Sequence, residues 1–248
     1  MPGARHPHPP AATETGHDAG AAHAEDPTLA RIGAFSDGVF AFAITLLILA
    51  IRIPHPTDGD AGEGLFKLPT QEWRSYLAFV LSFMIVGINW ANHRVMFKTF
   101  ARANHGLVWL NLLYLMIGVA FIPVPTAVLG AWLGSSSHDD QVVAAVFYGA
   151  VGTVGGLAYI LLWWYGAYAA KLTSPLLTEQ QRRAHTYAWL PAPFVIGLLT
   201  LVAFFSPPLA VAGYVVLVFA YVLPVPKLVV AWQRRRQAQA NHAGKAGR

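Results

Sequence analysis

Apolar residues gather in long runs that repeat along most of the chain. About 20 mainly apolar residues are needed for a helix to cross the hydrocarbon core of a bilayer. The pattern predicts six spans, at residues 27–53, 73–92, 105–120 (extended to about 130 past two prolines), 141–167, 187–205 and 208–228. We therefore expect an all-α, polytopic membrane protein with six transmembrane helices, whose membrane domain covers residues 27–232.

Composition supports this class and excludes several others. Of 248 residues, 55% are hydrophobic and only 12% are charged, whereas soluble domains carry about 25% charged residues. The chain has no Cys, which excludes a disulfide framework, Cys-ligated metal sites and thiol catalysis. Six spans occupy about 120 residues, so little remains for a soluble domain, and no phosphate-binding loop motif occurs.

The basic residues predict the orientation. With a cytosolic N-terminus, 14 of the 17 Lys and Arg residues lie on the inner side, and only Arg52, Lys67 and Arg74 lie outside. Cytoplasmic loops carry the excess of positive charge, so both termini are expected in the cytosol of a multi-pass protein of the cell membrane. Four aromatic residues near the inner end of the fourth span are expected to form an interfacial belt: Trp163, Trp164, Tyr165 and Tyr168.

Polar tails flank the predicted membrane domain. Residues 1–26 are rich in Ala, Gly, Pro and His, a composition typical of a disordered segment, and they lack the apolar core of a signal peptide. Four histidines there could bind metal, although a solvated tail is the simpler interpretation: His6, His8, His17 and His23. Residues 233–248 form a basic cytosolic tail. Its Arg234–Arg236 cluster fits lipid headgroups better than nucleic acid.

The first span carries an ionisable residue at an unusual depth. Asp26-Pro27 is a favourable helix start, and Asp37 lies about 9 Å further along the axis than Arg31. His93 and Asn111 reach a similar depth on the next two spans. The Asp37 carboxylate could accept hydrogen bonds from both, which would offset the cost of burial. The three residues could pin the helices together or take part in ion or proton movement.

Helical phase separates two faces of the first span. At about 100° per residue, four residues form one stripe: Phe42, Thr45, Leu46 and Leu49. Asp37 lies about 140° away from Phe42, so we expect Asp37 to point into its own subunit. The stripe could face lipid, core or another surface.

The motifs of the first three spans resemble one family. The pattern begins with Arg31-x-x-x-Phe35-Ser36-Asp37 and continues with Gly38–Ala41 and Thr45–Leu47. It resumes on the next two spans at Gly87-x-x-Trp90-x-x-His93-Arg94-x-x-Phe97, at Leu110–Leu113, and at Phe121–Thr126. In these residues the chain resembles the endosomal/lysosomal potassium channel family, the transmembrane protein 175 family, in its bacterial single-repeat form.

The resemblance implies a potassium-permeable cation channel, assembled as a homotetramer in the lipid bilayer, with the first helix lining the pore. It implies a hydrophobic constriction of Phe42, Leu46 and Leu49, with Thr45 as a polar layer that contacts the ion. It further implies a polar network that positions the pore helix: Arg31, Ser36, Asp37, His93 and Asn111. Potassium is the permeant ion, and no cofactor or nucleic acid is expected. The family more often has Ile or Leu where this chain has the bulkier Phe42.

Two other functions would use some of the same residues. A proton channel or proton-coupled transporter would use Asp37 and His93 as relay groups, although the sequence has no inverted repeat. A hydrolase built on Ser36, His93 and Asp37 is disfavoured, because neighbouring side chains on a helix diverge by about 100°. We therefore expect a channel and not an enzyme.

Overall fold

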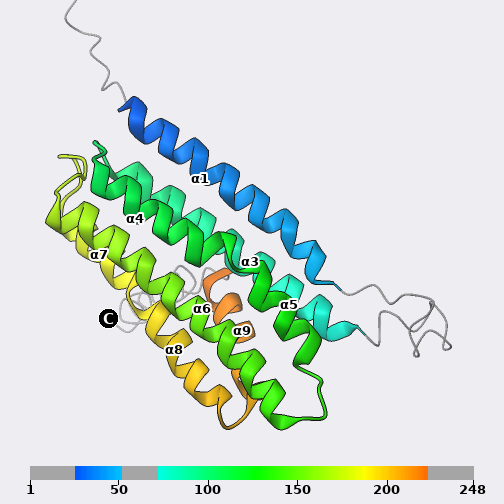
Figure 1. The fold of residues 1–248 in the computed structure, drawn as a ribbon. Coiled ribbons are helices and arrows are strands. Elements are labelled where there is room, and N and C mark those ends of the chain that lie inside the picture. Colours follow the sequence, from blue (N-terminus) through cyan, green and yellow to red (C-terminus); the bar gives the residue numbers. More distant parts are fainter. Residues whose placement is uncertain (1–25, 52–71, 223–248) are drawn as a thin grey trace, which may run out of the picture.

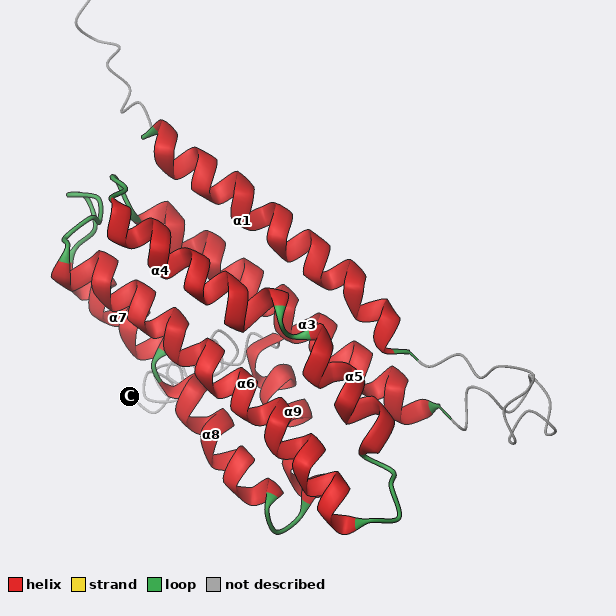
Figure 2. Ribbon diagram, viewed as in Figure 1, coloured by secondary structure: helices red, strands yellow, loops and turns green. Residues whose placement is uncertain are grey.

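The computed structural model describes residues 26–51 and 72–222, and every regular element in these ranges is helical (Figure 2). The expected all-α fold is thus confirmed. The helices are α1 (Pro27–Leu46), α3 (Trp73–Thr99), α4 (His105–Leu115), α5 (Pro123–Trp132), α6 (His138–Trp164), α7 (Glu179–Trp189), α8 (Pro191–Ala203) and α9 (Pro207–Val222). A 3-10 turn at Leu47–Ala50 extends α1. Widened π turns follow α4 at Met116–Ala120 and α6 at Tyr165–Ala169.

Among the described residues, five helical segments are long and apolar enough to cross a membrane: Pro27–Ala50, Trp73–Thr99, His105–Trp132, His138–Ala169 and Glu179–Ala203. The shorter apolar helix α9 corresponds to the sixth predicted span. Residues 1–25 and 233–248 of the predicted tails lie outside the described residues. So do residues 223–228 of the sixth span and the outer-loop basic residues Arg52 and Lys67. The orientation in the membrane stays a prediction.

Two predicted boundaries were wrong. The second span was expected to end at residue 92, but α3 continues to Thr99. The fifth was expected to begin at residue 187, but its helix begins at Glu179 and breaks at Leu190, before Pro191. A capping box formed by Thr178 and Gln181 starts α7. The hydropathy pattern missed this start because α7 is mostly polar.

Helix α6 lies at the centre of the bundle and packs against α4, α5, α8 and α9. Helix α1 lies at the edge, against α3 and α4 (Figure 1). One apolar core joins α1, α3, α4 and α6 and includes Phe40, Leu47 and Val86. A second core joins α3, α5, α6, α8 and α9 around Tyr148 and Tyr214. The two cores divide the bundle into a part that holds α1 and a part that holds α9.

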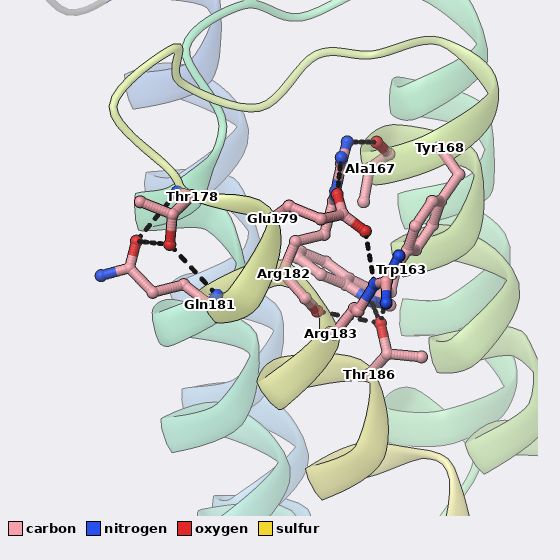
Figure 3. A network of polar contacts seen from close by, with 9 residues as sticks. All are labelled: Trp163, Ala167, Tyr168, Thr178, Glu179, Gln181, Arg182, Arg183 and Thr186. Carbon is pink, nitrogen blue, oxygen red and sulfur yellow. Dashed lines mark hydrogen bonds and ion pairs between the residues drawn. The ribbon is translucent and has the colours of Figure 1, made fainter.

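Helix α7 is fastened to the end of α6 by the polar contacts drawn in Figure 3. Thr186 accepts a hydrogen bond from Trp163 Nε1 at 2.9 Å, bonds the Tyr168 hydroxyl at 2.9 Å, and donates to the Arg182 carbonyl. Arg182 also donates to the carbonyl of Ala167, at the widened turn that ends α6. Trp163 is therefore a core residue, 1% exposed, and its predicted place in an interfacial aromatic belt was wrong. Trp164 is exposed, as an interfacial residue would be.

Three segments meet at the end of the bundle where α1 begins. The backbone of Ala101 donates to the Leu172 carbonyl, and that of Ser174 donates to the Thr99 carbonyl, both at 2.8 Å. These bonds join the α3–α4 loop to the segment between α6 and α7. Asp26 joins the same loop from the start of α1. These three segments are the ones that the basic residues predict to be cytosolic.

Candidate functional site

Helix α1 buries one narrow stripe against its own chain. Its buried side chains, together with the first residue of the 3-10 turn, are Ile32, Ser36, Phe40, Ala43 and Leu47. At 100° per residue these positions fall within about 80° of the helix circumference. The rest of the surface of α1 is only partly buried or is exposed in the described part of the chain. A helix attached in this way is positioned by few contacts, so each polar one matters.

A buried hydrogen-bonded relay crosses from α3 through α4 to this stripe. The His93 ring nitrogen Nε2 lies 2.8 Å from Asn111 Oδ1, and Asn111 Nδ2 donates to Ser36 Oγ at 3.0 Å. Ser36 Oγ in turn donates to the carbonyl of Ile32 at 2.8 Å. Because Asn111 Oδ1 can only accept, His93 must carry its proton on Nε2. All three polar side chains are at most 2% exposed, so the relay has no competition from solvent.

Aromatic rings hold His93 in its orientation. The His93 ring stacks on Phe97 with centroids 4.3 Å apart and on Tyr114 with centroids 5.8 Å apart. Phe40 of α1 lies against the same imidazole at 5.4 Å. Offset aromatic contacts of this kind fix ring planes. The geometry makes His93 the point where α1, α3 and α4 meet.

Asp37 does not occupy the place that the sequence predicted for it. It is exposed on the single chain, and its Oδ1 accepts a hydrogen bond from Trp90 Nε1 at 2.8 Å. Ser36, one residue earlier, takes the expected position beside Asn111. The Arg94 guanidinium lies over the Trp90 ring, 5.7 Å from its centroid. Of the five predicted network residues, the structure joins Ser36, His93 and Asn111, whereas Arg31 and Asp37 are exposed outside the relay.

The predicted stripe of the first span lies away from the bundle. Phe42 is 64% and Leu49 75% exposed, Thr45 is also exposed, and Leu46 is half-buried. Counted around the helix, Thr45 lies about 180° from the centre of the buried stripe. These apolar side chains are thus available to lipid or to another protein surface.

Asp26 fastens the start of α1 with both carboxylate oxygens. Oδ1 accepts from the backbone of Thr28 and Oδ2 accepts from the backbone of Ala103, both at 2.9 Å. These hydrogen bonds, that to Ala103 above all, lower the pKa of the Asp26 carboxyl below its usual value. The sequence identified Asp26 as a helix cap but gave no sign of the contact with the α3–α4 loop.

A second buried polar cluster, which no sequence motif predicted, joins α3, α5 and α6. Thr126 Oγ1 donates to Ser82 Oγ at 2.7 Å, and the Ser82 hydroxyl lies 2.9 Å from the Tyr148 hydroxyl. Single hydroxyls in apolar helices give little signal, and only their similar depth on three spans could have suggested this contact. Within the described ranges no three His, Asp or Glu residues gather as metal ligands would.

Comparisons with known proteins identify the family. Residues 31–123 match the sequence model described as "Endosomal/lysosomal potassium channel TMEM175". A protein of Streptomyces collinus, named a potassium channel, is 40% identical over 203 residues, which cover 79% of this chain and 94% of that relative. The chain belongs to the TMEM175 family. A second TMEM175 relative, from Chamaesiphon minutus and also named a potassium channel, is 35% identical over 193 residues, covering 78% of this chain and 93% of the relative.

A solved structure shares the TMEM175 fold. The crystal structure of a lysosomal potassium-selective channel TMEM175 homolog from Chamaesiphon minutus matches with a TM-score of 0.70 and 32% identity, covering 79% of this chain and 97% of that one. The resemblance noted from the motifs is therefore confirmed, and the chain is a multi-pass membrane protein. The TMEM175 family is one of ion channels, so the enzyme alternative is excluded. The hydrolase triad that the sequence disfavoured has no support in the geometry either, because His93 Nε2 bonds Asn111 and not Ser36.

Proposed function

We propose that this chain forms a potassium-permeable channel in which α1 of each subunit lines the pore. The observation that carries the proposal is the placement of Phe42, Thr45 and Leu49 on the face of α1 turned away from its own bundle. The potassium-channel names of the relatives in Streptomyces collinus and Chamaesiphon minutus support potassium as the ion.

Four subunits would complete the pathway. One exposed stripe cannot enclose a pore, whereas copies of it around a rotation axis can. The tetramer itself is an expectation from the family resemblance. In such an assembly the exposed stripe would become the inner wall, and the bundle behind it would separate the pathway from lipid.

The constriction would be formed by the apolar side chains of this stripe. The 3-10 turn that begins at Leu47 supports a continuous column, because residues three apart eclipse in a 3-10 helix. Leu49 therefore projects on the same side as Leu46, beyond Thr45 and Phe42. Apolar rings of this kind close a pathway by excluding water.

Thr45 would supply the polar layer between the apolar rings. Its hydroxyl donates to the Phe42 carbonyl at 2.7 Å, which uses the only hydrogen of that group. Two acceptor positions exist on a hydroxyl oxygen, and the side chain is exposed. The oxygen is thus oriented to accept, which suits contact with a partly dehydrated cation.

The relay of Ser36, Asn111 and His93 would hold α1 in register with the bundle. It supplies one hydrogen bond, from Asn111 to Ser36, to a helix whose other buried contacts with the chain are apolar. In this role the three residues position the pore helix and do not contact the ion. Asp37 would stay outside the relay, on the exposed side of α1, where it accepts a hydrogen bond from Trp90.

Ion flux through liposomes containing the purified protein tests the proposal. Phe42→Ala and Leu49→Asn should raise potassium flux or weaken discrimination against sodium, because the first makes the constriction wider and the second makes it more polar. Matched controls are Phe194→Ala and Leu198→Asn on α8, where the side chains are 61% and 62% exposed. If the α8 variants change flux as much as the α1 variants, α1 does not line the pathway.

A cysteine experiment separates this proposal from the proton alternative. The chain has no Cys, so Thr45→Cys and the control Leu198→Cys each introduce one thiol. A charged ammonium-bearing thiol reagent should block potassium flux through Thr45→Cys and leave Leu198→Cys unaffected. Silence to potassium, together with proton flux that Asp37→Asn abolishes, would instead assign transport to the polar residues.

A further inference from the structure

One face of α3 is turned away from the described part of the bundle over most of the helix. Val80, Phe83 and Trp90 are 55%, 41% and 38% exposed, and Arg94 and Lys98 near the end of the helix are also exposed. At 100° per residue these positions fall within about 80° of the helix circumference. We call them, together with the half-buried glycine on the same side, the α3 face: Val80, Phe83, Gly87, Trp90, Arg94 and Lys98.

The α3 face changes once from apolar to basic. Val80 and Phe83 are apolar, whereas Arg94 and Lys98 carry two positive charges one turn apart. At a rise of about 1.5 Å per residue, Arg94 lies about 16 Å further along the axis than Phe83. One leaflet contributes about half of a hydrocarbon core of about 30 Å. The face is therefore as long as one leaflet, with apolar groups at the depth of acyl chains and cations at the depth of headgroups.

The basic end of this face has the charge to bind an anion. The ion pairs in the described ranges lie on α7, so neither Arg94 nor Lys98 is paired with a carboxylate there. The Trp90 ring lies under the Arg94 guanidinium and holds it at the helix surface. Side chains four residues apart on a helix are neighbours, so both cations can contact one phosphate group. Basic residues at the membrane surface attract anionic lipids.

The apolar part of the α3 face contains a gap that suits a hydrocarbon chain. Gly87 lies one turn from Phe83 on one side and from Trp90 on the other. A Cβ at Gly87 would meet no atom within 4 Å, so the space between the two rings is open. A soluble anion would leave this apolar surface uncovered, whereas an acyl chain would cover it. Charge and length together therefore fit a lipid.

We propose that the α3 face binds one anionic phospholipid. Its phosphate lies between Arg94 and Lys98, and one acyl chain lies in the gap at Gly87, between Phe83 and Trp90. The headgroup is at the end of the bundle where α1 begins, which the basic residues predict to be cytosolic. The occupant is thus a lipid of the inner leaflet. The site does not include the stripe of α1 that is proposed to line the pore.

Trp90 connects this lipid site to α1. Its N–H donates to Asp37 of α1, so it is not available to the lipid, while its ring contacts the Arg94 guanidinium. A phosphate that restrains Arg94 also restrains this ring. The bound lipid therefore supports a contact between α1 and α3 that lies outside the buried relay.

Photolabelling tests the site in the purified full-length protein in nanodiscs of phosphatidylcholine. The probe is phosphatidylglycerol with a diazirine midway along one acyl chain, and it should label the peptide containing residues 80–90 saturably. Arg94→Gln and Lys98→Gln should each raise the half-saturating probe fraction about fivefold, the effect of one basic residue at a membrane surface, and the double variant should raise it about 25-fold. These side chains are exposed, so the variants should fold normally.

Two variants serve as matched controls for the loss of charge. In Arg74→Gln the lost guanidinium lies over the Trp73 ring at 5.1 Å, the same kind of contact at the opposite end of α3. Arg183→Gln removes a 66% exposed cation that is already paired with Glu179. Both should leave the labelling of residues 80–90 unchanged. Gly87→Leu fills the gap and should reduce the labelling without changing any charge.

Four results would overturn the proposal. Labelling of residues 80–90 that is equal in wild type and the double variant, or equal with a phosphatidylcholine probe, would show no selection for an anionic headgroup. Glycerol phosphate that competes as well as unlabelled phosphatidylglycerol would identify a site for soluble anions. Absence of labelling in wild type would mean that protein, such as a second copy of the chain, covers the face. Unchanged labelling in Gly87→Leu would place the acyl chain elsewhere. All four measure binding, so they are independent of whether the chain conducts potassium.

Discussion

Asn111→Leu is expected to detach the polar anchor of α1 while keeping nearly the same side-chain volume. Asn111 is 1% exposed and bonds His93 on one side and Ser36 on the other. The substitution removes both bonds and leaves the buried Nε2–H of His93 without an acceptor. Ser36 loses less, because its hydroxyl still donates to the Ile32 carbonyl.

The size of the effect follows from these contacts. Side-chain hydrogen bonds within a membrane contribute about 0.6 kcal/mol each on average, and a buried unsatisfied donor costs about 1–3 kcal/mol. Two lost bonds and one orphaned donor together predict a loss of about 2–4 kcal/mol. Ser36→Ala removes only one of these bonds, so its effect should be smaller. The loss in the double variant should be less than the sum of the two single losses, since both substitutions break the same contact.

Reversible unfolding in mixed detergent micelles, followed by tryptophan fluorescence, measures the loss. Thr126→Val is the matched control: it also removes a fully buried hydrogen-bonding group, but Thr126 bonds Ser82 of α3 and not α1. It should cost about 1 kcal/mol and leave the potassium-to-sodium flux ratio unchanged, whereas Asn111→Leu should lower that ratio. An Asn111→Leu protein as stable as the Thr126→Val protein, with an unchanged flux ratio, would refute the anchoring role.

Two further predictions concern packing and pH. Gly155→Ala places a Cβ 2.7 Å from the Gly118 Cα, and since the backbone cannot rotate away, we expect the free energy of unfolding to fall by about 1–3 kcal/mol. Gly152→Ala, whose nearest neighbour is 3.4 Å away, should be neutral or stabilising by up to about 1 kcal/mol. Equal free energies of unfolding for the two variants would contradict the clash. The lowered pKa of Asp26 means that its stabilising contribution is complete above the ordinary aspartate pKa, about 3.9, and is lost as pH falls through the lowered value. Asp26→Asn should therefore reduce the difference in melting temperature between pH 6 and pH 3, and hydrogen exchange at Ala103 should report the same loss; a variant with the wild-type pH profile would assign the acid sensitivity to another group.

Depth along a span was predictable from the sequence, but rotation about the helix axis was not. Counting residues from the predicted membrane boundary placed His93 and Asn111 at the level of Ser36 and Asp37, and the relay lies there. Which of the two neighbours on α1 faces the bundle depends on how α1 packs against α3 and α4. Periodicity alone does not predict how helices pack. The position facing the bundle was therefore assigned to Asp37, whereas Ser36 occupies it.

Hydropathy also predicts which segments cross the membrane better than it predicts where helices are capped or which side chains are buried. It located the spans because each buries apolar surface in lipid. It missed α7, whose start depends on the Thr178 capping box and whose position depends on Thr186. The clustering of aromatic residues also assigned Trp163 to an interfacial belt, because the sequence does not distinguish a tryptophan at the membrane interface from a buried one bonded through its N–H. Such contacts join residues far apart in the chain and become visible only when the helices are placed.

The widened turn at Met116–Ala120 sets the register between α4 and α5. A π turn holds one residue more than the α-helical turn it replaces. Deletion of a single residue in this turn would restore regular helical geometry locally, yet it would rotate everything that follows by about 100°. Thr126 would then no longer contact Ser82, and the buried face of α5 would lose its present contacts with the bundle. A deletion at this turn is thus expected to be tolerated less well than most substitutions in α5, although it removes no side chain from the core.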